Sequence, residues 1–366
     1  MDRQVTEKLR VVILFGGRSG EHDVSLASAT SVLNALDVNR FAPLPVYLDQ
    51  HGNWFPGTSP SDAARGDTVS SDSTIAACDL LNDPFRWLQN QADVVFPVLH
   101  GTYGEDGTMQ GLLEILGLPY VGPGVAASAV AMDKAIFKQL MEAHGLPVLP
   151  WQLVTAKQLD AEVDQVIDQL EAKLAYPLFT KPANLGSSVR ISRCEDRSDL
   201  LAGLKEARRY DLRVVVEQGI RPRELEIAIL GNDDPQASVV GEIRPQRSFY
   251  DYTAKYLSGD SELLIPAPLD ARTARDSQEL AIAAFRAIDG VGMGRVDLFL
   301  DATDERLYVN EINTIPGFTE ISMFPKLWEA SGIGYRELVT QLIDLGLERA
   351  RQTQTLTRTY RALVAE

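Results

Sequence analysis

The chain has 366 residues and is 45% hydrophobic, so it is long enough for two or three globular domains with apolar cores. Its formal net charge of −16 argues against a nucleic-acid partner, because proteins that bind nucleic acids present a basic surface. Its two cysteines, Cys78 and Cys194, do not make a disulfide framework. These properties predict a globular protein of the reducing cytoplasm.

The first third of the chain alternates apolar runs with polar or glycine-rich stretches. Residues 11–15 are too few for a signal sequence or a membrane span, so we expect a buried strand and no membrane partner. A glycine turn and the apolar periodicity of residues 24–36 then predict a helix, which is typical of an α/β unit. Residues 56–74 are polar and are expected to lie on the surface, and 94–99 predict a buried parallel strand.

The rest of the chain continues this pattern of helices and strands. Asp133 is a good helix N-cap residue, and Gly145 ends the helix that it begins. Helical spacing of apolar residues over 335–345 predicts a last helix. Short apolar segments predict strands at 177–180, 213–217, 225–230 and 238–243.

The most informative polar pattern lies in two segments near the C-terminus. Because side chains of a strand alternate between its faces, Arg295 and Asp297 share one face of the first segment. Glu311 and Asn313 share one face of the second, and the polar stretch 301–306 can turn the chain back. A hairpin would gather Asp297, Glu311 and Asn313 as oxygen ligands of the kind that Mg²⁺ prefers. Arg295 would add a charge for phosphate oxygens, whereas the alternative is a solvated hairpin face.

Two lysines and one small-residue loop are candidates for phosphate binding. Lys134 and Lys181 lie next to apolar segments and could reach phosphates, although isolated lysines are usually surface residues. The loop 186–188 could present backbone N–H groups to phosphate, or it could be an ordinary turn. It is not a P-loop, because the Gly-Lys-Ser/Thr ending is missing.

Four further side chains lie where α/β units place chemistry. Glu217 and Glu224 could accept hydrogen bonds from adenine or ribose, or form ion pairs at a strand end. Glu21 follows a glycine turn at an expected helix start, where it either caps the helix or binds a substrate ammonium group. His100 follows a buried strand, and its alternatives are a catalytic group and a hydrogen-bonded loop histidine. Motifs for a serine nucleophile or a cysteine-rich zinc site are absent from the sequence.

Taken in order, these segments resemble the D-alanine–D-alanine ligases of the ATP-grasp group, over nearly the whole chain. The motifs that carry the resemblance are GGRSGEHDVS at 16–25, HGTYGEDG at 100–107, MDK at 132–134, KP at 181–182, GSSV at 186–189, YDYTAKY at 250–256, GRVD at 294–297 and NEINTIPGFT at 310–319. Each motif is weak alone, and their common order is specific. The resemblance implies an α/β (α+β) fold of three domains: a Rossmann-like N-terminal domain of residues 1–125, a central ATP-grasp subdomain of 126–220 and a C-terminal subdomain of 221–366.

The resemblance also implies a role for each matching residue. Phosphate-binding lysines would be Lys134, Lys181 and, from a loop, Lys255. The adenosine pocket would be lined by Glu217, Gln218, Ile220, Glu224, Phe249 and Phe299. Two Mg²⁺ (or Mn²⁺) ions would be held by Asp297, Glu311 and Asn313.

Two molecules of D-alanine are the substrates that the resemblance implies, with ATP as the energy source. The first would lie near a hydrogen-bonded trio of Glu21, Ser187 and Tyr256, with His100 at the same substrate end. The tetrahedral oxyanion would be stabilised by Arg295 and the backbone of Gly317. Ser322 and the backbone of Met323 would hold the carboxylate of the second D-alanine. A homodimer is expected, because members of the group are usually dimers.

Two departures from the family pattern are present. Arg190 follows the 186–189 motif where the group usually has glycine, and the 56–74 segment is longer than in compact members. Three alternatives stay open: a D-alanine–D-lactate ligase, an ATP-grasp ligase for another acid and amine, and a nucleotide-binding protein that has lost catalysis. The motifs around Glu21 and His100 argue against the second alternative, and the retained metal and phosphate residues argue against the third.

The loop tyrosine Tyr256 separates the first alternative from a dipeptide ligase. D-alanine–D-lactate ligases lack this tyrosine, whose hydroxyl can link Glu21 and Ser187. We expect the Tyr256→Phe substitution to raise depsipeptide formation relative to dipeptide formation. Chromatography of the products made from D-alanine and D-lactate at neutral pH measures the ratio, and an unchanged ratio would remove this role from Tyr256.

Overall fold

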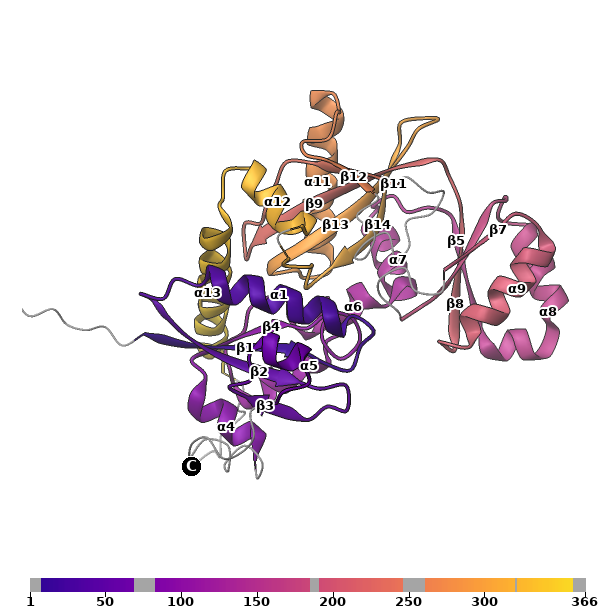
Figure 1. Ribbon diagram of the computed structural model, residues 1–366. Helices are drawn as coiled ribbons and strands as arrows, with labels where there is room; N and C mark the ends of the chain where they lie inside the picture. The colour runs from indigo at the N-terminus through magenta and orange to yellow at the C-terminus, as the bar shows by residue number, and fades with distance from the viewer. Residues whose placement is uncertain (1–7, 69–82, 185–190, 246–260, 320, 358–366) are drawn as a thin grey trace, which may run out of the picture.

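The structure is a computed structural model that describes residues 8–68, 83–184, 191–245, 261–319 and 321–357. Within these ranges the chain forms three β-sheets with helices packed against them (Figure 1). None of the helices in these ranges combines the length and the apolar character that a membrane span needs.

The first sheet contains the N-terminal strands in the order β3-β2-β1-β4. Strand β1 (Leu9–Gly16) pairs in parallel with β2 (Phe41–Leu48) and β4 (Val94–Val98), while β3 (Trp54–Pro56) is antiparallel to β2. The apolar run 11–15 is fully buried, so the predicted first strand is confirmed, and β4 confirms the predicted buried parallel strand. Among its described residues, this region has the helices α1 (His22–Ala35), α2 (Pro60–Ala64), α4 (Pro84–Gln91) and α5 (Thr108–Leu116).

The polar segment 56–74 was expected to lie on the surface, and the structure describes its residues up to 68. Its described part contains the short helix α2, which contacts α1. Ser59 caps this helix by accepting the N–H of Asp62, and Pro60 lies in its first turn. Residues 64–68 are exposed, as the predicted surface position requires, whereas Pro60 and Ala63 of the helix are buried.

The second sheet is fully antiparallel and has the order β5-β8-β6-β7. Its strands are β5 (Trp151–Thr155), β6 (Leu178–Pro182), β7 (Ser192–Cys194) and β8 (Arg213–Gln218). Helices α8 (Ala156–Glu171) and α9 (Arg197–Arg208) cover one face through a shared apolar core. Figure 1 shows this sheet and its two helices as a separate lobe at the right of the view.

The third sheet has the order β12-β11-β9-β13-β14, with the short strand β10 on β9. Its strands are β9 (Pro222–Gly231), β10 (Gln236–Ala237), β11 (Gly241–Pro245), β12 (Ser261–Leu264), β13 (Gly292–Asp301) and β14 (Leu307–Asn313). The helices α6 (Val125–Met132), α7 (Lys134–Ala143) and α11 (Ala271–Ala287) share a core with this sheet. Helix α7 begins and ends where Asp133 and Gly145 predict.

The predicted strand 238–243 is wrong at its start, because β11 begins only at Gly241. The hydroxyl of Ser238 accepts the N–H of Ala228 and donates to the carbonyl of Val239. A side chain thus takes contacts that a neighbouring strand's backbone would otherwise make, which is how serine competes with regular structure.

The last two helices join the first sheet to the third. Helices α12 (Met323–Ala330) and α13 (Tyr335–Gln354) contribute buried residues to a core that also contains residues of β1, β4 and α1. The predicted last helix is therefore confirmed. This packing holds the loop between β14 and α12 close to the ends of β1 and β4, where the polar turns 16–21 and 100–107 lie.

Candidate active site

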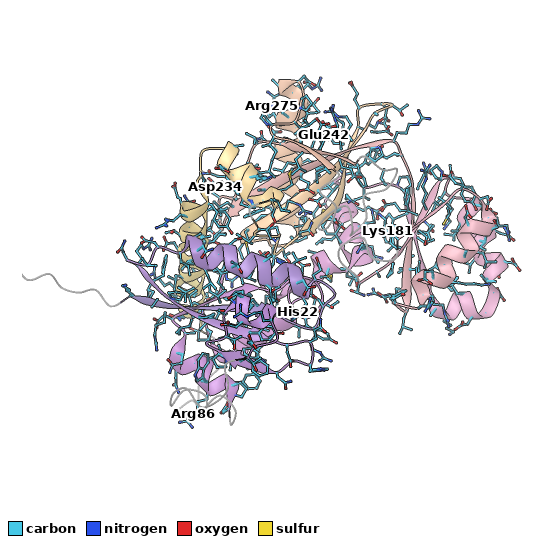
Figure 2. All side chains as sticks on the ribbon, in the orientation of Figure 1. His22, Arg86, Lys181, Asp234, Glu242 and Arg275 are labelled. Carbon is cyan, nitrogen blue, oxygen red and sulfur yellow. The ribbon has the colours of Figure 1, made fainter. Side chains whose placement is uncertain are left out.

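A cavity of about 430 Å³ lies between the second and third sheets. This volume is in the range of small-molecule and cofactor sites. Strands β6, β8, β9, β13 and β14 all contribute side chains, and Figure 2 places Lys181 on the side of the second-sheet lobe that faces the rest of the molecule. The predicted site residues that line the cavity are Lys181, Glu217, Ile220, Glu224, Asp297, Phe299 and Glu311.

Two lysines share one carboxylate at the second-sheet end of the cavity. Lys181 Nζ lies 3.1 Å from Glu217 Oε1, and Lys138 Nζ from α7 lies 2.5 Å from Glu217 Oε2. Burial would raise the pKa of Glu217, but the charges of Lys138 and Lys181 outweigh burial and bring this pKa to about 2. Glu217 therefore carries its negative charge at neutral pH. Lys138 was not predicted from the sequence, although its position one helical turn after Lys134 places both on a similar side of the helix.

At the opposite end, β13 and β14 form the predicted hairpin. Asp297 lies opposite Glu311 and Arg295 lies opposite Asn313, with a β-bulge directly after Asp297. The amide of Asn313 donates to Asp297 Oδ2 over 3.1 Å. Arg295 donates from Nε and Nη2 to the two Asp297 oxygens, over 2.7 and 2.6 Å. The hairpin is confirmed, and its polar face is a connected ion-pair network rather than a set of separately solvated side chains.

The neighbouring strand β9 adds a carboxylate that we did not predict. Glu226 lies directly opposite Asp297, and its Oε2 is 3.0 Å from Arg295 Nε. Three adjacent strands therefore carry a row of carboxylates, formed by Glu226, Asp297 and Glu311. Arg295 pairs with the first two of them. Part of the signal was present in the sequence, because the predicted strand 225–230 contains Glu226; the observed strand β9 begins earlier, at Pro222, and so places Glu226 on the same face as Glu224.

The donor set of the hairpin fits a hard divalent cation. Asp297 and Glu311 offer carboxylate oxygens and Asn313 offers an amide oxygen, which are ligand types that Mg²⁺ takes. An ionised carboxylate has about four lone-pair sites, so the Arg295 contact does not exhaust Asp297. The described residues contain no group of three or more His, Cys, Asp or Glu placed to hold a metal ion. The candidate set consists instead of two carboxylates and the amide of Asn313.

A second polar cluster lies where the first sheet meets the loop after β14. Glu21 is the N-cap residue of α1, is buried, and makes no capping hydrogen bond with its side chain. Glu21 thus lies at the predicted helix start, but it does not cap the helix through a side-chain hydrogen bond. Gly101 has φ +71°, and a Cβ there would come 2.6 Å from Glu21 Oε2. Glycine is required at this position for both reasons, and it lets the 100–107 turn lie directly against Glu21.

His100 connects three segments of this cluster. Its Nδ1 donates to the carbonyl of Ile315 over 2.9 Å, which leaves Nε2 to accept from Ser28 Oγ at 3.1 Å. Ser28 Oγ in turn accepts the N–H of Phe318. Burial lowers the pKa of His100, against the opposing charge of Glu21. The neutral ring thus holds the loop 314–318 against α1, which agrees with the hydrogen-bonded alternative and also fixes the position of Gly317.

The loop after β14 leads into the N-terminus of α12. Ser322 is the N-cap residue, and its Oγ accepts the N–H of Thr319 and lies 2.7 Å from Thr319 Oγ1. A Cβ on Gly317 would come 2.8 Å from Ser322 Oγ, so only glycine fits without displacing that side chain. Met323 is buried in the first turn. The N–H groups of a first helical turn are suited to a carboxylate.

Several predicted residues are not gathered in the cavity. Gln218 accepts the N–H of Ala175 with its side chain and is absent from the cavity lining. Lys134 begins α7 and is also absent from that lining. Five further residues named in the sequence analysis lie outside the described residues: Ser187, Arg190, Phe249, Lys255 and Tyr256.

Glu105 predicts a measurable pH dependence of stability. Burial, reinforced by the charge of Glu21, raises the pKa of Glu105 to about 8. In the unfolded chain a glutamate has a pKa of about 4.3. Between these values the unfolded state has lost a proton that the folded state keeps, so the free energy of unfolding falls as pH rises and levels off above about pH 8.

The Glu105→Gln substitution is expected to flatten this dependence, because the amide can still accept the N–H of Gly101 but does not titrate. Urea unfolding at about pH 5, 6.5 and 8 measures how the free energy of unfolding depends on pH. Glu337→Gln on α13 removes an exposed carboxylate and is the matched control. An equal slope in the Glu105→Gln variant and the wild type would contradict the assignment.

The antiparallel second sheet, the third sheet and the cavity enclosed between them make up an ATP-grasp fold. Solved structures agree with this class. The D-alanine–D-alanine ligase of Coxiella burnetii superposes with a TM-score of 0.78 at 35% identity, covering 95% of this chain and 97% of that chain. The VanG D-Ala:D-Ser ligase of Enterococcus faecalis gives 0.79 at 30% identity, covering 93% and 100%.

Sequence comparisons narrow the class to one family. The model of the D-ala D-ala ligase N-terminus matches residues 10–123, and that of the C-terminus matches 140–344. The chain is 50% identical over 354 residues to the D-alanine–D-alanine ligase of Heliobacterium modesticaldum, covering 95% of this chain and 97% of the relative. The Geobacillus kaustophilus enzyme is 46% identical over 363 residues, covering 97% and 99%. The chain belongs to the D-alanine–D-alanine ligase family.

Proposed function

We propose that this protein joins two molecules of D-alanine into D-alanyl-D-alanine at the expense of ATP, for the synthesis of peptidoglycan precursors. The observation that carries the proposal is the cavity that connects Lys181 and Glu217 at one end with Asp297 and Glu311 at the other. A nucleotide needs partners for its base at one end and for its phosphates and cation at the other. The family to which the chain belongs supplies the reaction.

In the proposed complex the adenosine lies at the second-sheet end. Glu217 accepts a hydrogen bond from the adenine amino group, and Glu224 accepts from the ribose. Phe299 and Ile220 pack against the base, and Lys181 turns toward the phosphates. We propose Lys134 and Lys255 as further phosphate ligands, with Gln218 and Phe249 beside the base.

Two Mg²⁺ or Mn²⁺ ions are proposed at Asp297, Glu311 and Asn313. When bound, such ions neutralise phosphate charge and polarise the phosphoryl group. The chain's part is to place three hard oxygen donors on one face of a rigid hairpin. Arg295, which also pairs with Glu226, holds Asp297 in a fixed position on that face.

The reaction begins when a carboxylate oxygen of the first D-alanine attacks the γ-phosphorus and ADP leaves. Arg295 and Lys181 offset the negative charge that gathers on the phosphoryl group. Glu21, with Ser187 and Tyr256, is proposed to hold the ammonium end of this D-alanine, while His100 fixes the facing loop. The product of this step is D-alanyl phosphate.

In the second step the amine of the other D-alanine attacks the acyl carbon. Ser322 and the backbone of Met323 hold its carboxylate. The tetrahedral oxyanion accepts hydrogen bonds from Arg295 and the N–H of Gly317, a type of contact worth about 3–4 kcal/mol per donor. The carbon–oxygen bond to phosphate then breaks, which releases inorganic phosphate and the dipeptide. Positioning of the two substrates is the main task of the site.

We also propose a homodimer in the cytoplasm and the division into residues 1–125, 126–220 and 221–366. The packing of α6 and α7 against the third sheet supports tight contact across the second of these boundaries. Sedimentation at micromolar concentration tests the dimer, and a monomer there would remove it.

Phosphate release from ATP and Mg²⁺ tests the function, with D-alanine, L-alanine, D-lactate or D-serine as the added substrate and the products separated by chromatography. We expect release with D-alanine and formation of the dipeptide. D-lactate and D-serine, each offered with D-alanine, test the alternative second substrates. If phosphate is released with none of the four substrates, the protein would have to be an ATP-dependent ligase for another acid and amine.

A further inference from the structure

Lys138 is a buried cation that the proposed reaction does not use. Its side chain is 3% exposed, and its Nζ lies 2.5 Å from Glu217 Oε2. Lys181 occupies the other oxygen of the same carboxylate, at 3.1 Å. Burying a second lysine beside a carboxylate that already has one is costly, and burial lowers the pKa of Lys138. The burial of Lys138 beside the Lys181–Glu217 pair therefore needs a functional or structural explanation.

The two lysines differ in what they can reach. Lys181 lines the cavity and its side chain is 11% exposed, whereas Lys138 is absent from the cavity lining. Lys138 belongs to α7, whose residues Phe137 and Met141 are fully buried in the core of the third sheet. The helix is also fixed at its start, where Asp133 caps it. Lys138 is therefore held on Glu217, and Lys181 is the partner that a ligand in the cavity can attract.

We propose that Lys138 is the permanent counter-ion of Glu217, which allows Lys181 to leave that carboxylate and bind a nucleotide phosphate. Separating Lys181 from a carboxylate without another partner would leave a buried charge uncompensated, which is strongly unfavourable. With Lys138 in place, Glu217 keeps one ion pair while Lys181 moves. Lys138 is thus a positioning residue that touches no substrate. The inference rests on the proposed function, in which Lys181 binds phosphate.

The test compares ligands that differ only in their phosphates. Calorimetry gives the affinities of adenosine, ADP with Mg²⁺ and a non-hydrolysable ATP analogue with Mg²⁺ for the full-length protein. In the Lys138→Met variant Lys181 becomes the sole counter-ion of Glu217, so its transfer to phosphate is opposed. We expect the affinity for the triphosphate to fall about tenfold or more, while the affinity for adenosine changes by less than about threefold. An equal loss for both ligands, or no loss, would overturn the inference.

A double-mutant cycle separates this role from simple packing. In a Lys181→Met background Glu217 no longer has Lys181 to retain. Adding Lys138→Met is therefore expected to cause no further loss of triphosphate preference. Additive losses would contradict the proposal. Lys205→Met on α9 removes an exposed lysine and is the matched control, with all affinities unchanged.

A second variant serves if Lys138→Met is too unstable to purify. The Lys138→Met/Glu217→Gln pair removes both buried charges, and the glutamine carbonyl can still accept from adenine. Lys181 is then unbound, and we expect a triphosphate preference at least equal to that of the wild type; a lost preference would overturn the inference. If Lys181→Met itself leaves the triphosphate preference intact, the proposed phosphate site and the inference both fail, whereas a loss there with none in Lys138→Met defeats the inference alone.

Discussion

Replacing Asp297 with asparagine is expected to lower ligase turnover by at least about 100-fold and to raise the Mg²⁺ concentration needed for half-maximal activity. The substitution removes one of two carboxylates from the proposed cation site and leaves an amide in its place. Metal ions supply several kcal/mol of transition-state stabilisation, and each 1.4 kcal/mol is a factor of ten in rate. Phosphate release measured over a range of Mg²⁺ concentrations gives both quantities.

The control for this experiment lies on the same hairpin. Asp304 is in the turn between β13 and β14, where its Oδ1 accepts the N–H of Arg306 outside the cavity lining. The Asp304→Asn variant is expected to keep the wild-type rate and Mg²⁺ dependence. If Asp297→Asn kept an unchanged Mg²⁺ dependence, the cation would have to be held elsewhere in the chain.

The Arg295→Met substitution is expected to lower the turnover number by about 10²–10³-fold, the usual effect of losing one donor to an oxyanion. It should differ from Asp297→Asn in its metal dependence. Removing the guanidinium leaves Glu226 and Asp297 facing each other across β9 and β13, which favours rather than opposes a bound cation. The Mg²⁺ requirement is therefore expected to stay equal or fall while the rate collapses.

Stability must be measured beside activity for this variant. Arg295 and Asp297 have side chains that are 13% and 12% exposed, and breaking a buried ion pair costs about 3–5 kcal/mol. Arg223→Met is the matched control, because Arg223 pairs with Glu242 on the same sheet without lining the cavity. It should lose stability and keep turnover. Equal rates in Arg295→Met and Arg223→Met would exclude the proposed oxyanion role.

The hairpin could be predicted from sequence because its information is local. Strand alternation alone places Arg295 with Asp297, and the polar turn 301–306 returns the chain in the next few residues. The bulge after Asp297 was beyond that reasoning, because strand alternation does not show that Asn310 on β14 would be left without a partner on β13. Its effect is to shift the register between the part of the hairpin that carries the proposed cation ligands and the part that carries Phe299.

Lys138 and Glu226 were not predicted, because their contacts join segments that are distant in the sequence. Lys138 looks like an ordinary helical lysine, and its partner Glu217 is far away in the sequence. Only the packing of α7 against the third sheet makes it a buried cation. Glu226 was within reach of strand periodicity, but its contact with Arg295 requires the pairing of β9 with β13. The loop roles of Ser187, Lys255 and Tyr256 stay predictions from the family resemblance.

The proposed reaction is tested most directly with D-alanine that carries ¹⁸O in its carboxylate. In the proposed mechanism a carboxylate oxygen bonds to the γ-phosphorus and stays there when the acyl carbon is attacked. Each inorganic phosphate released should therefore contain one ¹⁸O, in step with dipeptide formation, when analysed by mass spectrometry. Unlabelled phosphate would mean that water attacks ATP at this site, and it would contradict ligation through D-alanyl phosphate.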